Sequence, residues 1–216
     1  MQKIILACLS LSLVGGMSSA RADLLPFSVT FTSKGFERIA HRRGISVFKH
    51  RESEIIKLGA EGRFGYSPEQ VQRVLLDYRR QLGNVARLTE AKVLKRGRNW
   101  LLVYQRLNLP VIDDRDFTLK VTWGTRKDGS RWVKYRTARG GPPPRSGIVR
   151  VTNHHGSWLI RPIKDGRGSL VRFQVTIDMA GMLPRWMAKS GSGKEVPDLF
   201  LTFNKLLLQQ YLRSRG

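Results

Sequence analysis

Apolar and polar residues alternate through much of the chain between residues 85 and 178, and this period of two is typical of strands with one buried face. The pattern is clearest at residues 115–125, where four apolar residues share one face: Phe117, Leu119, Val121 and Trp123. Gly59 and Gly62 interrupt an earlier strand and predict bulges or a strong bend there. Strands are predicted at residues 45–50, 55–64, 85–95, 100–107, 115–125, 131–137, 148–152, 157–161 and 170–177.

Two segments have helical periodicity instead. Ser67, Pro68 and Gln70 form a helix start with a capping-box spacing, and apolar residues at helical spacing follow as far as residue 82. A second helix is predicted at residues 197–213, with a wide apolar face. Because this helix and the apolar sheet face each need a partner, the economical α+β architecture is one curved antiparallel sheet around the long C-terminal helix.

The N-terminal residues have the features of a secretory signal. Lys3 precedes an apolar stretch of about eleven residues, and Ala20-Arg21-Ala22 fits the small-x-small pattern before a cleavage site. We therefore expect a signal peptide at residues 1–22, a single domain at residues 23–216, and a secreted, periplasmic protein. The alternative is an N-terminal anchor, for which the apolar stretch is short.

Composition adds one strong constraint. The chain has 216 residues, a formal net charge of +23 and 41% apolar residues, and its single cysteine, Cys8, lies in the expected signal peptide. These values exclude wholesale disorder, and the mature protein would have no disulfide or thiol chemistry. In an exported protein such charge favours an anionic membrane surface as partner over nucleic acid. The alternative is an ordinary solvated basic surface.

Four segments resemble, in their order and spacing, the START domains, the StAR-related lipid-transfer family. They are GISVF at 44–48, LP at 109–110 with DRDF at 114–117, VR at 149–150 with GSWLIRP at 156–162, and DMAGMLPRW at 178–186. The resemblance extends over about residues 31–212. It implies a helix-grip fold enclosing a hydrophobic cavity, and binding and transfer of one lipid or other hydrophobic molecule.

The same resemblance implies which residues face the ligand. From the apolar pattern alone these side chains would form an ordinary filled core, and only the resemblance favours a cavity among them. Tyr104, Arg150 and Trp158 are the candidate polar contacts. The apolar candidates are Phe117, Leu119, Val121, Trp123, Val171, Phe173, Val175, Leu199, Phe203 and Leu206.

Two segments are candidates for contact with a membrane. The proline-rich residues 140–147, which include Pro143 and Arg145, correspond in the family to a loop over the tunnel mouth, and the alternative is a plain rigid turn. Arg185 and Trp186 combine the basic and indole side chains that favour the head-group zone. The alternative for Trp186 is a place in the core beneath the last helix.

The sequence offers little support for catalysis. His154 and His155 are adjacent on a predicted strand and would face opposite ways, which disfavours a shared metal. The acidic residues around Arg115 indicate a salt-bridged turn rather than an acid/base pair. We therefore expect a monomer without catalytic residues, metal, cofactor or nucleic-acid partner. The alternative function is a helix-grip enzyme of the aromatase/cyclase type, acting on an apolar substrate.

Overall fold

The computed structural model describes residues 31–32, 34–51, 53, 55–163, 168–180 and 192–213. The expected signal peptide lies outside these residues, as do Arg185 and Trp186. None of the helices in the described part of the chain is both long enough and apolar enough to cross a membrane.

The described strands form one curved ten-stranded sheet with the order β1-β2-β3-β10-β9-β7-β6-β5-β4, and β8 pairs in parallel with β6. Neighbouring strands along that order are antiparallel. The strands are β1 (Phe36–Arg42), β2 (Ile45–His50), β3 (Ile56–Phe64), β4 (Leu88–Gly97), β5 (Trp100–Leu107), β6 (Asp114–Thr125), β7 (Arg131–Thr137), β8 (Ile148–Arg150), β9 (Asn153–Pro162) and β10 (Ser169–Asp178).

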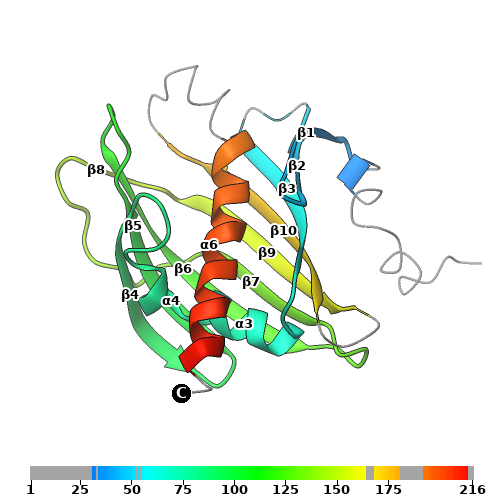
Figure 1. Cartoon of the computed structure of the whole chain (residues 1–216). Helices are drawn as coiled ribbons and strands as arrows, with labels where there is room; N and C mark the ends of the chain where they lie inside the picture. Colours follow the sequence, from blue (N-terminus) through cyan, green and yellow to red (C-terminus); the bar gives the residue numbers. More distant parts are fainter. Residues whose placement is uncertain are drawn as a thin grey trace, which may run out of the picture.

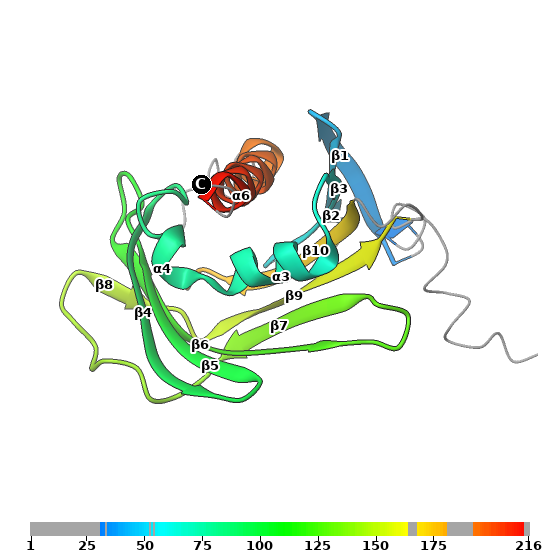
Figure 2. The same ribbon diagram turned by 60° about the horizontal axis from the view of Figure 1, so that its bottom comes forward.

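The long helix α6 (Ser192–Arg213) crosses the concave face of this sheet (Figure 1). Figure 2 looks nearly along α6 and shows it within the curve of the strands. The short helices α3 (Pro68–Leu76) and α4 (Tyr78–Gln81) lie on the same face, where α3 contacts β7, β9 and α6. This arrangement confirms the predicted helix-grip α+β fold.

The first predicted helix is present but divided in two. Ser67 and Gln70 form the predicted reciprocal capping box at the start of α3. Asp77 then ends α3 and caps α4, because its carboxylate accepts a hydrogen bond from the Arg80 amide. A side chain that caps the backbone competes with helix continuation, so the apolar periodicity alone could not place this break.

Of the two alternatives predicted at Gly59 and Gly62, a bulge or a strong bend, the bulge is wrong. The pairing of β3 with β10 runs without a register shift from Ile56 to Phe64. Each glycine instead gives room to a ring. A Cβ atom on Gly59 would lie 2.2 Å from the Phe31 ring, and one on Gly62 would lie 3.1 Å from the Phe200 ring.

Two other elements differ from the sequence-based expectation. The edge strand β1 was not predicted, because most of its side chains are exposed and no apolar alternation marks it. Helix α6 begins at Ser192 rather than at Pro197. Val196, which precedes the proline, is buried in the same core as Phe200, which lies one turn later. The apolar face of the helix therefore extends to residues before Pro197.

The core lies between the concave face and α6. Phe200 and Phe203 of α6 reach Trp158 of β9, with ring centroids 5.5 and 5.6 Å apart. Trp158 in turn stacks on Phe173 of β10 at 4.3 Å. These aromatic contacts fix the helix against the middle of the sheet and leave open space on the side of β4 to β7.

Candidate functional site

A cavity of about 200 Å³ lies between the concave face of the sheet and helices α3, α4 and α6. The sheet, the helices and the segment between α4 and β4 all contribute apolar side chains. These are Leu75, Val85, Leu88, Leu107, Leu119, Val133, Trp158, Phe173, Val175, Leu199 and Phe203. Such a lining favours an apolar molecule through the burial of apolar surface.

The polar side chains of the cavity are few. Tyr78, Tyr135 and His154 line it together with Gln81 and Gln105. Gln81 already donates a hydrogen bond to the Leu75 carbonyl. No Asp, Glu, Lys or Arg contributes to the lining among the described residues.

His154 is the most distinctive of these groups. Its ring meets Phe117 edge-on, with centroids 4.6 Å apart, and meets Tyr135 at 5.2 Å. Its Nδ1 atom is buried and has no hydrogen-bond partner among the described residues. Burial, with a smaller effect of His155, lowers the pKa of His154 to about 4, so its imidazole is neutral at pH 7.

The two tyrosines are also uncharged at neutral pH. Burial raises the pKa of both Tyr78 and Tyr135 above its ordinary value. A hydroxyl can donate and accept a hydrogen bond, whereas a neutral imidazole offers one donor and one acceptor. The cavity therefore combines apolar walls with neutral hydrogen-bonding groups.

The structure brings six of the predicted ligand-facing residues together around the cavity: Leu119, Trp158, Phe173, Val175, Leu199 and Phe203. Five others lie in the same core but do not line the cavity: Phe117, Val121, Trp123, Val171 and Leu206. Tyr78, Tyr135 and His154 also line the cavity and were not predicted. Tyr78 could have been found from the sequence, because it lies on the apolar face of the predicted helix.

Tyr104 and Arg150, expected as polar contacts in the cavity, lie on the other side of the sheet. The register pairs Tyr104 with Thr118 and Arg150 with Asp116, and both partners alternate with the inward-facing Phe117. Asp116, which is 1% exposed, accepts hydrogen bonds from Arg150 at 2.5 and 2.9 Å and from the Tyr104 hydroxyl at 3.0 Å.

The proline-rich loop also differs from its expected place. Arg145 donates to the Tyr104 hydroxyl at 2.6 Å and to Glu90 at 2.9 Å, so the loop is tied to the outer face and not over the cavity. Pro143 lies in this loop and is exposed. Partial burial raises the pKa of Glu90, but hydrogen bonds from Arg145, Lys92 and Arg106 outweigh it and lower the value to about 2.

The acidic residues near Arg115 bind other arginines. Asp114 accepts a hydrogen bond from Arg106 at 2.6 Å, and Asp116 pairs with Arg150. Arg115, 2% exposed, donates to the backbone carbonyls of Asp113, Met179 and Ala180. It therefore anchors the end of β10, where the chain leaves the sheet toward α6.

No known family profile matches the sequence, and a search of curated proteins finds no significant match. Solved structures match well. Human STARD10 has a TM-score of 0.74 at 18% identity, over 88% of this chain and 83% of its own. A STAR-related lipid transfer protein from Xanthomonas axonopodis has a TM-score of 0.72 at 21% identity, over 80% of this chain and 98% of its own.

Human StAR-related lipid transfer protein 5 matches with a TM-score of 0.69 at 16% identity, over 86% of this chain and 96% of its own. The Zhui aromatase/cyclase of a Streptomyces species is more distant, with a TM-score of 0.51 at 9% identity, over 72% and 94% of the two chains. The chain thus has the helix-grip fold of START domains. No group of three or more residues suited to hold a metal ion occurs in the described part.

Proposed function

We propose that this protein binds one hydrophobic molecule in the cavity between the sheet and α6 and carries it between membranes. The observation that carries the proposal is the cavity itself, with apolar walls and five neutral hydrogen-bonding side chains. The START fold supports this proposal, because structurally similar proteins are described as lipid transfer proteins.

The chemistry of the lining restricts the ligand. A charged head group inside the cavity would lose its hydration without a counter-ion, which is costly. A hydroxyl or carbonyl, by contrast, would satisfy the buried Nδ1 of His154. The ligand we propose is therefore an apolar molecule with a neutral oxygen function near Tyr135 and His154.

An apolar turn provides a surface for docking on a membrane. Val111 is 85% exposed and has a positive φ of 70°, which is unfavourable for a β-branched residue. The turn follows Leu107, which lines the cavity. It ends just before Arg115, which holds the end of β10. Insertion of Pro110 and Val111 into a membrane would place the bilayer at this end of the cavity.

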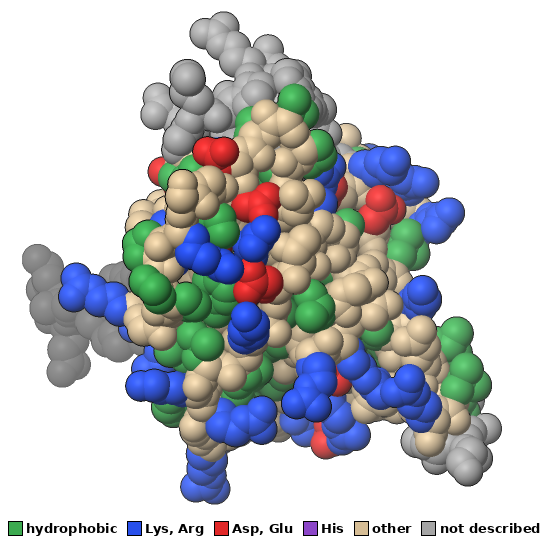
Figure 3. All heavy atoms as spheres, turned by 90° about the vertical axis from the view of Figure 1, so that its left-hand side faces the viewer, with side chains coloured by type: hydrophobic (Ala, Val, Ile, Leu, Met, Phe, Trp, Pro, Cys, Tyr) green, Lys and Arg blue, Asp and Glu red, His purple; other side chains and the backbone are tan. Residues whose placement is uncertain are grey.

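The basic surface would hold the protein near anionic lipids. Lys and Arg side chains are spread over the face that contains β4 and β8 and outnumber the carboxylates that lie among them (Figure 3). Each basic residue near an anionic membrane contributes on the order of 1 kcal/mol. In this proposal the protein acts as a monomer in the periplasm, after removal of residues 1–22.

The second candidate function is catalysis of the aromatase/cyclase type, and His154 is the observation that favours it. An unpartnered neutral imidazole between two rings in an apolar cavity would suit proton transfer. Turnover of an apolar polyketide-like substrate that is lost in His154→Gln would support this function over simple carriage.

Native mass spectrometry of the mature chain after purification, followed by lipid extraction, tests the main proposal. We expect one neutral lipid or other apolar molecule per chain. A ligand-free mass that stays unchanged after incubation with mixed lipid vesicles would contradict the proposal.

A further inference from the structure

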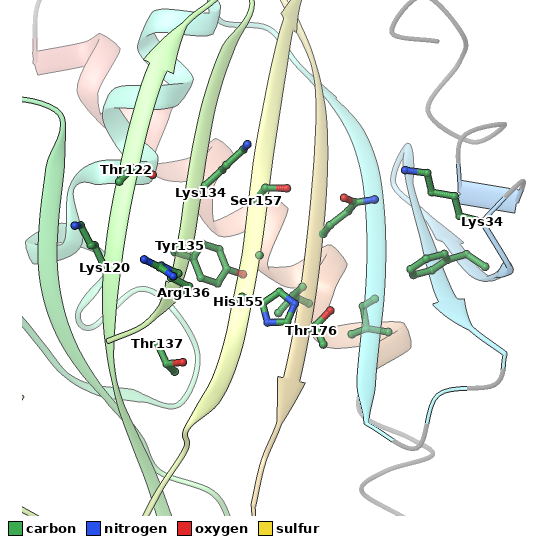
Figure 4. Close-up of a pocket in the computed structure, with 15 residues that line it drawn as sticks. Lys34, Lys120, Thr122, Lys134, Tyr135, Arg136, Thr137, His155, Ser157 and Thr176 are labelled. Carbon is green, nitrogen blue, oxygen red and sulfur yellow. The ribbon is translucent and has the colours of Figure 1, made fainter. Parts of the chain in front are cut away.

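A second hollow lies on the opposite face of the sheet from α6. It is a groove of about 990 Å³ across β6, β7, β9 and β10, with Lys34 and Phe36 at its other side (Figure 4). Polar side chains of the central strands line it, including Ser157, His155 and Thr176. The groove and the cavity lie on opposite faces of the sheet, because neighbouring residues of each strand face opposite sides. Tyr135 and Val175 line both of them.

Basic side chains converge on the groove. Lys120 of β6 is directly opposite Arg136 of β7, and Arg136 is directly opposite His155 of β9. Directly opposed residues of antiparallel strands have Cβ atoms about 5 Å apart, and like charges in such pairs are destabilising. Lys134 lies two residues before Arg136, and Lys34 lies across the groove (Figure 4).

None of the described carboxylates relieves this repulsion. The groove lining contains no Asp or Glu among the described residues, and no ion pair joins Lys120, Lys134 or Arg136 to a described carboxylate. The ammonium groups of Lys120 and Lys134 lie 5.6 and 5.4 Å from the ring centres of Trp100 and Trp132. These contacts hold the two lysines in place but leave their charge unbalanced.

The other half of the same face provides a contrast. There Arg106 and Arg145 share Glu90, and Arg150 binds Asp116. Among the described residues, the outer face therefore has a basic region whose charges are compensated and a basic groove whose charges are not. A set of opposed, uncompensated cations in a hollow is suited to an anion with several charges.

We propose that the groove binds a soluble anion with two or more phosphate groups. Lys120 and Arg136 would contact one group, and Lys134 would contact the next, with the hydroxyls of Thr122 and Ser157 as further donors. The site is recessed between the strands and Lys34, a shape that fits a small anion better than a flat bilayer. It also opens on the opposite face of the sheet from the cavity, and the basic residues that would bind the anion do not line the cavity.

Calorimetric titration of the mature protein with inorganic tripolyphosphate at low ionic strength tests the proposal. The groove variant is Lys120→Gln/Arg136→Gln, and the matched control is Lys95→Gln/Lys127→Gln, which removes the same charge at exposed positions outside the groove. We expect one site per chain, about tenfold weaker binding in the groove variant, and nearly unchanged affinity in the control.

Thermal unfolding provides a second readout. Tripolyphosphate should raise the unfolding temperature of the wild type and of the control more than that of the groove variant. Equal weakening in both double variants would show that only net charge matters and would overturn the proposal, as would absence of binding. A loss of binding to anionic vesicles as large as the loss for tripolyphosphate would assign the groove to the membrane and contradict a soluble ligand.

Discussion

His154 and His155 are neighbours in β9 but belong to different sites. The ring of His154 lies in the cavity, 4.6 Å from that of Phe117. The side chain of His155 lies on the outer face, opposite Arg136 in the groove. One strand thus contributes to an apolar, uncharged cavity on one face and to a basic groove on the other.

Acid should destabilise the protein through His154. Its pKa is about 4 in the folded protein against 6.5 for the free side chain, so the unfolded state binds more protons between these values. Stability is therefore lost as the pH falls from about 6.5 toward 4, by roughly 3 kcal/mol. Urea unfolding across this range should show the loss in the wild type and a smaller slope in His154→Gln. Parallel pH profiles would contradict the burial of this imidazole.

The wall formed by Tyr135 depends on Gly156. A Cβ atom at position 156 would lie 2.3 Å from the Tyr135 hydroxyl and 2.4 Å from the backbone oxygen of Gln174. Gly156→Ala should therefore cost about 1–3 kcal/mol in unfolding free energy and displace Tyr135 in the cavity. Gly65→Ala is the matched control, because nothing lies within 4 Å of its added Cβ. An equal effect of both substitutions would exclude this role of Gly156.

The hydrogen-bond network around Arg150 on the outer face of the sheet depends on the Asp116 carboxylate. Asp116→Asn would leave the Arg150 guanidinium without its counter-ion and should lower the unfolding free energy by about 2–3 kcal/mol. Glu69→Gln removes an exposed partner of Arg73 and should cost less than about 0.5 kcal/mol. Chemical denaturation of the two variants measures both losses of unfolding free energy. A small effect at Asp116 would mean that the proline-rich loop is held by other contacts.

Membrane docking should depend on the exposed turn. Val111→Asp places a charge where the proposal puts the bilayer, and it should weaken binding to anionic vesicles by about tenfold in a flotation assay. Val93→Asp, at an exposed apolar position of β4, is the control and should have little effect. Undiminished binding of the Val111 variant would place the docking surface elsewhere.

Much of the fold could be predicted from local sequence signals. The capping box at Ser67 and the alternation at Phe117–Trp123 predicted a helix start and a central strand that the structure contains. Strand β1 could not be predicted in this way, since an exposed edge strand such as Phe36–Arg42 lacks an apolar stripe. Its position depends on pairing with β2.

The candidate site was only partly predictable. Periodicity assigns residues to a face, so Leu119 and Phe173 were correctly placed on the inner side. Periodicity does not show where a core is left open, so it could not predict that Tyr135 and His154 line the cavity. Tyr104 and Arg150 do not reach the cavity because they lie on the outer face of the sheet. Their partner, Asp116, lies on the polar face of β6, and its place on that face was visible in the sequence.

Photo-crosslinking with a diazirine-bearing long-chain alcohol tests most directly whether an apolar molecule occupies the cavity. A protein that comprises residues 23–216 is irradiated with the probe, and the labelled peptides are identified by mass spectrometry. Labels at the cavity-lining parts of β9 and α6, near Trp158 and Phe203, are the result that we predict. Labels confined to surface positions such as Val111, with none in these two segments, would contradict the central claim.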